Sequence, residues 1–133
     1  MNQLLIKKRE DMSETRVAKV VFPNTTNHYD TLFGGIALQW MDEVAYIAAT
    51  RFARKQVVTI STEKVNFNKP IPTGILVELV ARVVKVGRTS LKVEVNIYLE
   101  QLHSDKVEKA ITGHFNFVAV GEDKCPTPIF SDA

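Results

Sequence analysis

The chain has a single cysteine, Cys125, among its 133 residues. One thiol cannot form a disulfide within the chain, and no cysteine or histidine pair has the spacing of a metal site. The composition therefore predicts neither a disulfide scaffold nor a metal centre. A reducing, cytoplasmic setting fits this cysteine content best.

Long apolar runs and blocks of one charge are also missing. No apolar stretch approaches the roughly 18 residues that cross a membrane, and residues 1–16 are too charged for a signal peptide. The net charge is only +2, and the basic residues are dispersed apart from Lys7-Lys8-Arg9. We therefore expect neither a membrane nor a nucleic acid as partner.

The size of the chain predicts one domain. With 133 residues, 45% of them hydrophobic, the chain can bury one core but not two ordinary ones. Residues 1–15 are charged and lack periodicity, so we expect a mobile N-terminal segment. The domain itself is expected over residues 16–120, and residues 121–133, which contain two prolines, are expected to form an extended C-terminal tail.

Periodicity predicts one short strand, one long helix and then four long strands. The strand is expected at 16–22, and the helix from Gly34-Gly35 to about residue 53, with no glycine or proline inside it. The later strands are expected at 56–67, 75–86, 89–101 and 107–120. Within 89–101, apolar residues alternate with polar ones, as in an antiparallel strand with one wet face. This order predicts an α+β domain in which one antiparallel sheet packs on one helix.

Two further features concern turns and helix faces. Gly87-Arg88 fits a two-residue hairpin turn with glycine at the first central position. Helical spacing places Asp42 in a stripe that is otherwise apolar, formed with Leu38, Ala45, Ala49 and Phe52. The opposite face carries Ile36, Trp40 and Ile47, so we expect the helix to be covered on more than one side, either by its own curved sheet or by another subunit.

Two groups near the helix start could carry chemistry. The backbone N–H groups at Gly34-Gly35 have no intrahelical partner and lie at the positive end of the helix dipole, where a developing oxyanion would be stabilised. The pair could equally serve a sharp turn or a close approach of another chain. Asp42 is costly in an apolar stripe unless it is paired or neutralised, so it is either a functional acid or a structural one.

The other polar candidates each have an ordinary structural role as well. Asn27 could simply form a local turn, and His28 beside it fits a loop residue better than a catalyst. Thr59, with Ser61 and Thr62, could be a hydroxyl on a wet strand face or a polar neighbour of Asp42. Arg88 could be solvated or could meet a phosphate with its planar fork. A nucleophile–histidine–acid triad is poorly supported.

Three stretches together resemble a known family. They are Asn27…Phe33-Gly34-Gly35…Met41-Asp42, then residues 57–74 with Val65-Asn66-Phe67-Asn68-Lys69-Pro70, and finally Lys85-Val86-Gly87-Arg88-Thr89-Ser90. In this order and spacing they look like the hotdog-fold acyl-CoA thioesterases of the YciA type, over about residues 16–120. The resemblance implies a long helix wrapped by a curved antiparallel sheet, a homodimer with active sites at its interface, and commonly a trimer of such dimers, a hexamer. It implies no metal and no cofactor, since coenzyme A belongs to the substrate.

The resemblance also implies roles for particular residues. Asp42 matches the catalytic carboxylate, and Asn27 matches a loop asparagine that faces it from the partner subunit. Gly34 and Gly35 match the helix start that polarises the thioester carbonyl, and Thr59 falls near a polar position beside the acid. The turn that would lie along coenzyme A comprises Gly87, Arg88, Thr89 and Ser90.

The chain departs from its relatives in the loop, where many have histidine in place of Phe33 and commonly glycine in place of Asp30. A second carboxylate at Asp30 could modulate the site. The sequence thus predicts hydrolysis of an acyl-CoA to a free acid and coenzyme A, with Asp42 as general base or as nucleophile. A non-enzymatic acyl-CoA-binding or sensing domain is one rival. A dehydratase is another, although His28 does not stand in the motif of that family.

Overall fold

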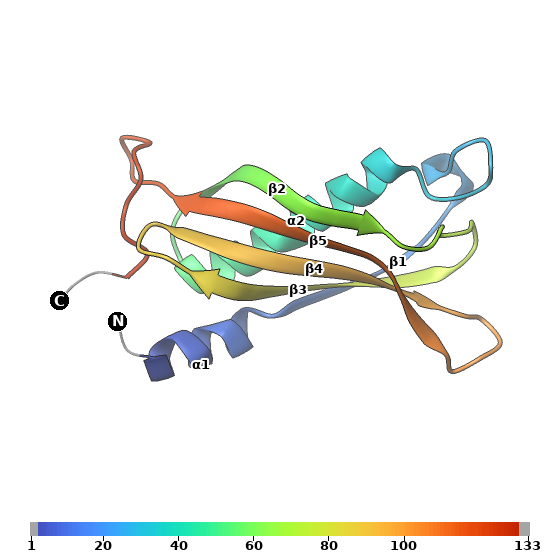
Figure 1. Ribbon diagram of the computed structural model, residues 1–133, viewed down its shortest axis with the longest axis horizontal. Helices are drawn as coiled ribbons and strands as arrows, with labels where there is room; N and C mark the ends of the chain where they lie inside the picture. Colours follow the sequence, from blue (N-terminus) through green and yellow to red (C-terminus); the bar gives the residue numbers. More distant parts are fainter. Residues whose placement is uncertain (1–2, 131–133) are drawn as a thin grey trace.

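The computed structural model describes residues 3–130 of the chain. These residues form α1 (Gln3–Ser13), β1 (Thr15–Val20), a short 3-10 turn η1 (Pro23–Thr25), α2 (Gly34–Ala53), β2 (Val57–Phe67), β3 (Leu76–Val86), β4 (Ser90–Glu100) and β5 (Val107–Ala119). The long helix α2 lies across one face of a single curved sheet (Figure 1). This confirms the predicted α+β class and the arrangement that the resemblance implied.

The strands of the sheet are antiparallel and follow the order β1-β3-β4-β5-β2. Strand β2 pairs with β5 on one side only, so it forms an edge of the sheet. Val58 and Ile60 on this strand are 41% and 57% exposed. An unpaired strand edge with exposed apolar side chains is a surface to which another chain can add.

The core lies between the sheet and α2. On the central strand β4, every second residue from Leu91 to Leu99 is buried, as the alternation in the sequence predicted. Across from the sheet, α2 presents Ala45, Ala48 and Ala49, which are fully buried. Small side chains let the helix approach the sheet closely, and each buried branched side chain contributes about 1.5–3 kcal/mol.

The predicted faces of α2 are only partly correct. Ala45, Ala49 and Phe52 are buried, but Asp42 and Leu38 are only partly buried, so Asp42 lies on the flank of the helix. Trp40, which we expected on the face opposite Asp42, is buried by the chain itself, one of the two alternatives for covering this face. Lys19 Nζ lies 5.0 Å from the centroid of the Trp40 ring. Ile36 packs partly against the core, and Ile47 remains 38% exposed.

The N-terminal segment is a helix, which the sequence did not predict. Ile6 of α1 is buried against the core, and Arg9 Nη1 donates a hydrogen bond to the backbone oxygen of Phe52 at the end of α2. A single buried apolar residue produces no periodic pattern, because the packing that holds this helix comes from elsewhere in the fold. Residues 1–2 of the expected segment lie outside the described residues.

The C-terminal segment folds back on the sheet. Thr127 donates from its backbone to Ala119, Ile129 donates to Arg88, and Ile129 is buried. The irregular backbone expected here is present up to residue 130, but it packs along the domain rather than extending from it. Residues 131–133 lie outside the described residues.

The turn between β3 and β4 differs from the predicted type. A glycine at the first central position would need a positive φ, and within residues 3–130 the only glycine with one is Gly74, at +83°. The Gly87 N–H instead donates to the Ser90 oxygen at 2.7 Å, so Arg88 and Thr89 are the central residues. A Cβ on Gly87 would lie 2.9 Å from Ser90 Oγ, a side-chain atom that can rotate away, so this contact alone does not require glycine.

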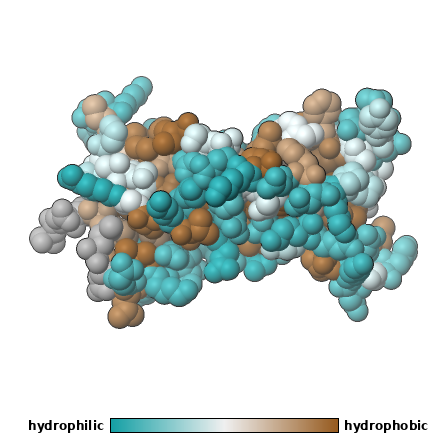
Figure 2. Space-filling view, in the orientation of Figure 1, coloured by the Kyte–Doolittle hydropathy of each residue, from teal (hydrophilic) through white to brown (hydrophobic). Residues whose placement is uncertain are grey.

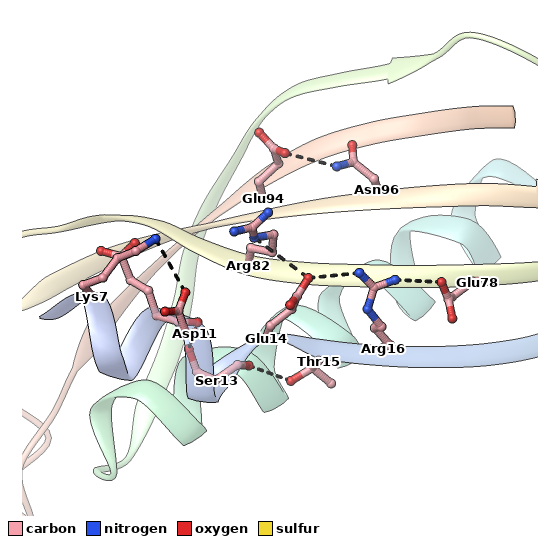
Figure 3. A network of polar contacts seen from close by, with 11 residues as sticks. Lys7, Asp11, Ser13, Glu14, Thr15, Arg16, Glu78, Arg82, Glu94 and Asn96 are labelled. Atoms are coloured by element: carbon pink, nitrogen blue, oxygen red, sulfur yellow. Dashed lines mark hydrogen bonds and ion pairs between the residues drawn. The ribbon is translucent and has the colours of Figure 1, made fainter. Parts of the chain in front are cut away.

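The outer face of the sheet is hydrophilic. Figure 2 shows this face in front of α2, with polar side chains across its middle. On it, Arg16 forms ion pairs with Glu14 and Glu78, and Glu14 also lies 3.9 Å from Arg82 (Figure 3). The outer face of the sheet therefore carries ion pairs, whereas the face that packs against α2 carries buried apolar side chains.

Candidate active site

Asp42 and Thr59 lie together between α2 and the edge strand β2. Thr59 Oγ1 donates a hydrogen bond to Asp42 Oδ1 at 3.0 Å, and this contact is exposed to solvent. The strand has a bulge between Thr59 and Ser61, and bulges re-aim side chains. The contact engages Oδ1 of Asp42, and among residues 3–130 Oδ2 has no hydrogen-bond partner, so it is available to act as a general base or nucleophile.

The N-terminus of α2 is open. Phe33 is the N-cap, no side chain caps the helix, and no acid stands in its first turn. The first backbone bond within the helix runs from Ala37 N–H to Phe33, so the N–H groups of Gly34, Gly35 and Ile36 have no partner in the helix. These donors and the helix dipole favour an anionic oxygen at this end.

Neither helix-start glycine is required by the chain's own packing. A Cβ on Gly34 would meet Phe67 at 3.7 Å, and one on Gly35 would meet Phe33 at 3.8 Å, which are ordinary contacts. Neither glycine has a positive φ. The explanation that the pair serves a sharp turn is therefore not supported, whereas the close approach of a substrate or another chain still accounts for it.

Asn27 makes its hydrogen bonds within its own loop. Its Oδ1 accepts from the backbone N–H groups of Tyr29 and Thr31 and from the Thr31 hydroxyl. Within residues 3–130 its amide nitrogen Nδ2 has no hydrogen-bond partner. The structure therefore supports the local-turn interpretation for one end of this side chain, and leaves the other end able to donate.

The remaining loop residues have structural explanations. Asp30 has a φ of +59°, a conformation that favours glycine, asparagine or aspartate, and its backbone oxygen accepts from Thr73. The residue that departs from the family pattern is thus suited to its backbone position. His28 is exposed, and its ring lies 3.9 Å from that of Tyr29 with a tilt of 41°; among residues 3–130 no acid pairs with it.

The turn of Gly87, Arg88, Thr89 and Ser90 lies at the end of the molecule where α2 finishes, opposite the helix start (Figure 1). The Arg88 side chain is exposed, and its backbone oxygen accepts from Ile129. Gly87 and Ser90 line a hollow together with two lysines that the sequence analysis did not single out, Lys85 and Lys92. Their positions on the polar faces of adjacent strands could have revealed them.

Several predicted site residues are therefore not brought together within one chain. The contact between Asp42 and Thr59 joins two of them, while the bonds of Asn27 stay in its loop and the Arg88 turn lies at the opposite end of α2.

In the described part of the chain, no cluster of three His, Cys, Asp or Glu side chains could hold a metal ion. No helix of residues 3–130 is long and apolar enough to cross a membrane.

Comparison with known proteins identifies the family. The sequence model of the thioesterase superfamily matches residues 29–105, which contain the whole of α2. The chain belongs to this superfamily. An uncharacterised acyl-CoA thioester hydrolase of Zymomonas mobilis is 37% identical to this thioesterase over 116 residues, or 87% of this chain and 78% of that protein. The acyl-CoA thioester hydrolase YciA of Salmonella typhimurium is 32% identical over 113 residues, or 83% of this chain and 85% of that protein.

Solved structures give the same result for the fold of this thioesterase. An acyl-CoA hydrolase of Staphylococcus aureus, bound to butyryl coenzyme A, coenzyme A and coenzyme A disulfide, has a TM-score of 0.87 at 37% identity, covering 90% of this chain and 73% of that chain. That enzyme was also solved as alanine variants of one aspartate, one threonine and one asparagine. A hexameric acyl-CoA thioesterase has a TM-score of 0.86 at 34% identity, covering 90% and 76%. The resemblance to the YciA type and the hotdog fold are confirmed.

Proposed function

We propose that this thioesterase hydrolyses an acyl-CoA to a free carboxylic acid and coenzyme A. The observation that carries the proposal is the Asp42 carboxylate, oriented by Thr59 on the same helix that begins with uncapped N–H groups. A base and a set of oxyanion donors are what attack of water on a thioester carbonyl requires. The substrate class is supported by the relatives, several of which are named acyl-CoA hydrolases.

Asp42 acts on water as a general base, or attacks the thioester itself to form a transient anhydride. In both routes the negative charge that develops on the thioester oxygen is stabilised by backbone donors at a helix start and by the amide of Asn27. The hydrogen bond from Thr59 holds one carboxylate oxygen and leaves the other for the reaction. General base catalysis alone typically supplies about 10²–10⁴-fold.

A complete site needs two copies of the chain. At about 1.5 Å per residue, Gly35 and Asp42 are separated by about 10 Å along one helix. Base and oxyanion donors must each lie about 3 Å from a reacting atom, so the two features of one helix are too far apart to share one carbonyl. Two antiparallel copies of α2 would bring the helix start and Asn27 of one chain to the Asp42 of the other.

The surface available for such a dimer lies beside the site. The free edge of β2 carries exposed Val58 and Ile60, and the neighbouring face of α2 carries exposed Tyr46 and Ile47. Pairing of two β2 edges would extend the sheet and cover these side chains together. We propose a homodimer built in this way, assembled further into a trimer of dimers, the hexameric state named for a related thioesterase.

Coenzyme A would be held at its nucleotide end by the β3–β4 turn. Arg88 is exposed there, and a guanidinium fork suits a phosphate. Gly87, Thr89 and Ser90 would contact the same part of the molecule through backbone and hydroxyl groups. We propose that the enzyme needs no metal and no further cofactor, because the carboxylate and the N–H donors supply the chemistry. We also propose that the enzyme is located in the cytoplasm.

The test is the release of free thiol from a panel of acyl-CoA substrates that differ in chain length. The proposal expects catalytic turnover with at least one chain length and no hydration of an enoyl-CoA by the same protein. Tight binding of acyl-CoA without thiol release would favour the non-enzymatic binding domain, and hydration would favour a dehydratase.

A further inference from the structure

A basic hollow lies at the opposite end of α2 from its N-terminus, between that helix and α1. Its volume is about 270 Å³, and it is lined by Leu5, Lys8, Arg9, Met12, Arg51 and Arg54. Four of these six side chains are cationic and none is acidic. On a chain whose net charge is only +2, this is a marked local concentration of positive charge.

Two of the cations are fixed by contacts within the fold. Arg9 Nη1 donates to the Phe52 backbone oxygen at 2.9 Å, and its guanidinium carbon lies 5.0 Å from the centroid of the Phe130 ring. Arg51 Nη1 donates to Thr15 Oγ1 at 3.1 Å. Each guanidinium therefore uses one nitrogen for the fold and keeps further donors, held in a set orientation.

The other two cations have no such contacts. Among the described residues, neither the Lys8 ammonium nor the Arg54 guanidinium has a hydrogen-bond partner, and none of the four cations is paired with a carboxylate. The neighbouring Lys7 is different, because it lies 3.6 Å from Asp11 on the same helix. The unpaired charges therefore gather at the hollow and are not a general property of α1.

The end of α2 does not account for this charge. The C-terminus of a helix carries about −0.5 of an elementary charge, which favours one cation nearby. Arg9 already binds a carbonyl of the last turn. Four full positive charges leave a large excess over the helix dipole, and bringing them together costs free energy unless an anion lies among them.

We propose that this hollow binds the phosphate groups of a small soluble phosphorylated molecule, at a site separate from Asp42. Guanidinium forks bind phosphate oxygens in pairs, and an ammonium adds a compact charge beside them. The exposed parts of Leu5 and Met12, which are 41% and 68% exposed, offer an apolar surface for the rest of the ligand. The cations line a hollow and not a flat surface, and a hollow suits a compact polyanion better than a membrane does.

The test uses sodium tripolyphosphate as the probe, titrated calorimetrically into the intact protein with coenzyme A present at saturation, so that the proposed phosphate site at Arg88 is already filled. The variants are Lys8→Gln and the double variant Lys8→Gln/Arg54→Gln. Lys7→Gln is the matched control, since it removes the same charge from the adjacent position on α1 but does not line the hollow. The double variant should weaken binding about tenfold or more, while the control should stay within about twofold of the parent.

Further measurements distinguish binding at this hollow from binding at the coenzyme A site and from binding to anionic phospholipid. The double variant should leave the KM for acyl-CoA unchanged. Coenzyme A should displace only the tripolyphosphate held at the β3–β4 turn, and the binding that remains in its presence should be the part that the double variant loses. Saturable binding that survives in the double variant, a raised KM, or binding only to vesicles that contain anionic phospholipid would each overturn the proposal.

Discussion

At the scale of single residues, the site depends on which end of a polar side chain is already engaged. The Thr59 hydroxyl donates its hydrogen bond to Asp42. The amide oxygen of Asn27 accepts hydrogen bonds from its own loop. Asp42 thus keeps an oxygen for the reaction, and Asn27 keeps its donor nitrogen. The sequence named both contacts as alternatives, Thr59 beside Asp42 and Asn27 in a local turn, but it could not choose them, because they depend on the bulge in β2 and on the turn at residues 27–31.

Asn27→Asp separates the two roles of this side chain. Aspartate keeps the oxygen that accepts from Tyr29 and Thr31 but lacks the donor nitrogen, so the loop should keep its structure. We expect unchanged thermal stability and a fall in kcat equivalent to about 2.7–4 kcal/mol, as for loss of one oxyanion donor. Asn27→Ala is the comparison, since it removes both roles. Activity of the aspartate variant within a few-fold of the parent would exclude a donor role.

At the scale of elements, the strands and α2 follow from the sequence more closely than the connections do. The alternation in β4 and the uninterrupted helical stretch up to Ala53 are strong local signals, and both elements lie within about a residue of their expected bounds. The helix α1 and the β3–β4 turn were missed or mistyped. Both depend on contacts that no local pattern contains, namely Arg9 with Phe52 and Gly87 with Ser90.

The β3–β4 turn can be tested through Arg88. Arg88→Ala should raise the KM for acyl-CoA with a smaller effect on kcat, because an interaction remote from the reacting carbonyl stabilises ground state and transition state alike. A truncated acyl-pantetheine lacks the nucleotide phosphates and should be hydrolysed equally well by parent and variant. Equal losses on both substrates would mean that Arg88 acts through the fold or the chemistry.

The start of β5 carries a measurable electrostatic contact. Hydrogen bonds from Lys69, then from Lys106, lower the pKa of Glu108 from 4.5 to about 2. Because the folded-state pKa is depressed, the stabilisation is fully present above pH 4.5 and is lost as the pH falls toward 2. The titration of Glu108 followed by NMR should give this low value, and Lys69→Met should raise it. A Glu108 pKa near 4.5 in the parent would show that the pairs do not persist in solution.

At the scale of the whole molecule, the proposed site is divided between two chains. A chain of Asp42→Asn and a chain of Asn27→Asp each lack one component, but a mixed dimer holds one intact site. Subunit exchange between the two inactive variants should therefore restore activity, up to about a quarter of the parent if exchange is random and each site is independent. Hybrids verified by mass spectrometry that recover no activity would place both residues in one chain's site.

The most direct measurement compares Asp42→Asn with Glu43→Gln. Both variants neutralise one acid at adjacent positions of α2, but Glu43 is exposed and Asp42 is hydrogen-bonded to Thr59. With acyl-CoA and a thiol-release assay, Asp42→Asn should lose about 10²-fold or more in kcat while retaining its folding and assembly, and Glu43→Gln should keep the parent rate. Hydrolysis by Asp42→Asn within a few-fold of the parent would contradict the assignment of the catalytic carboxylate.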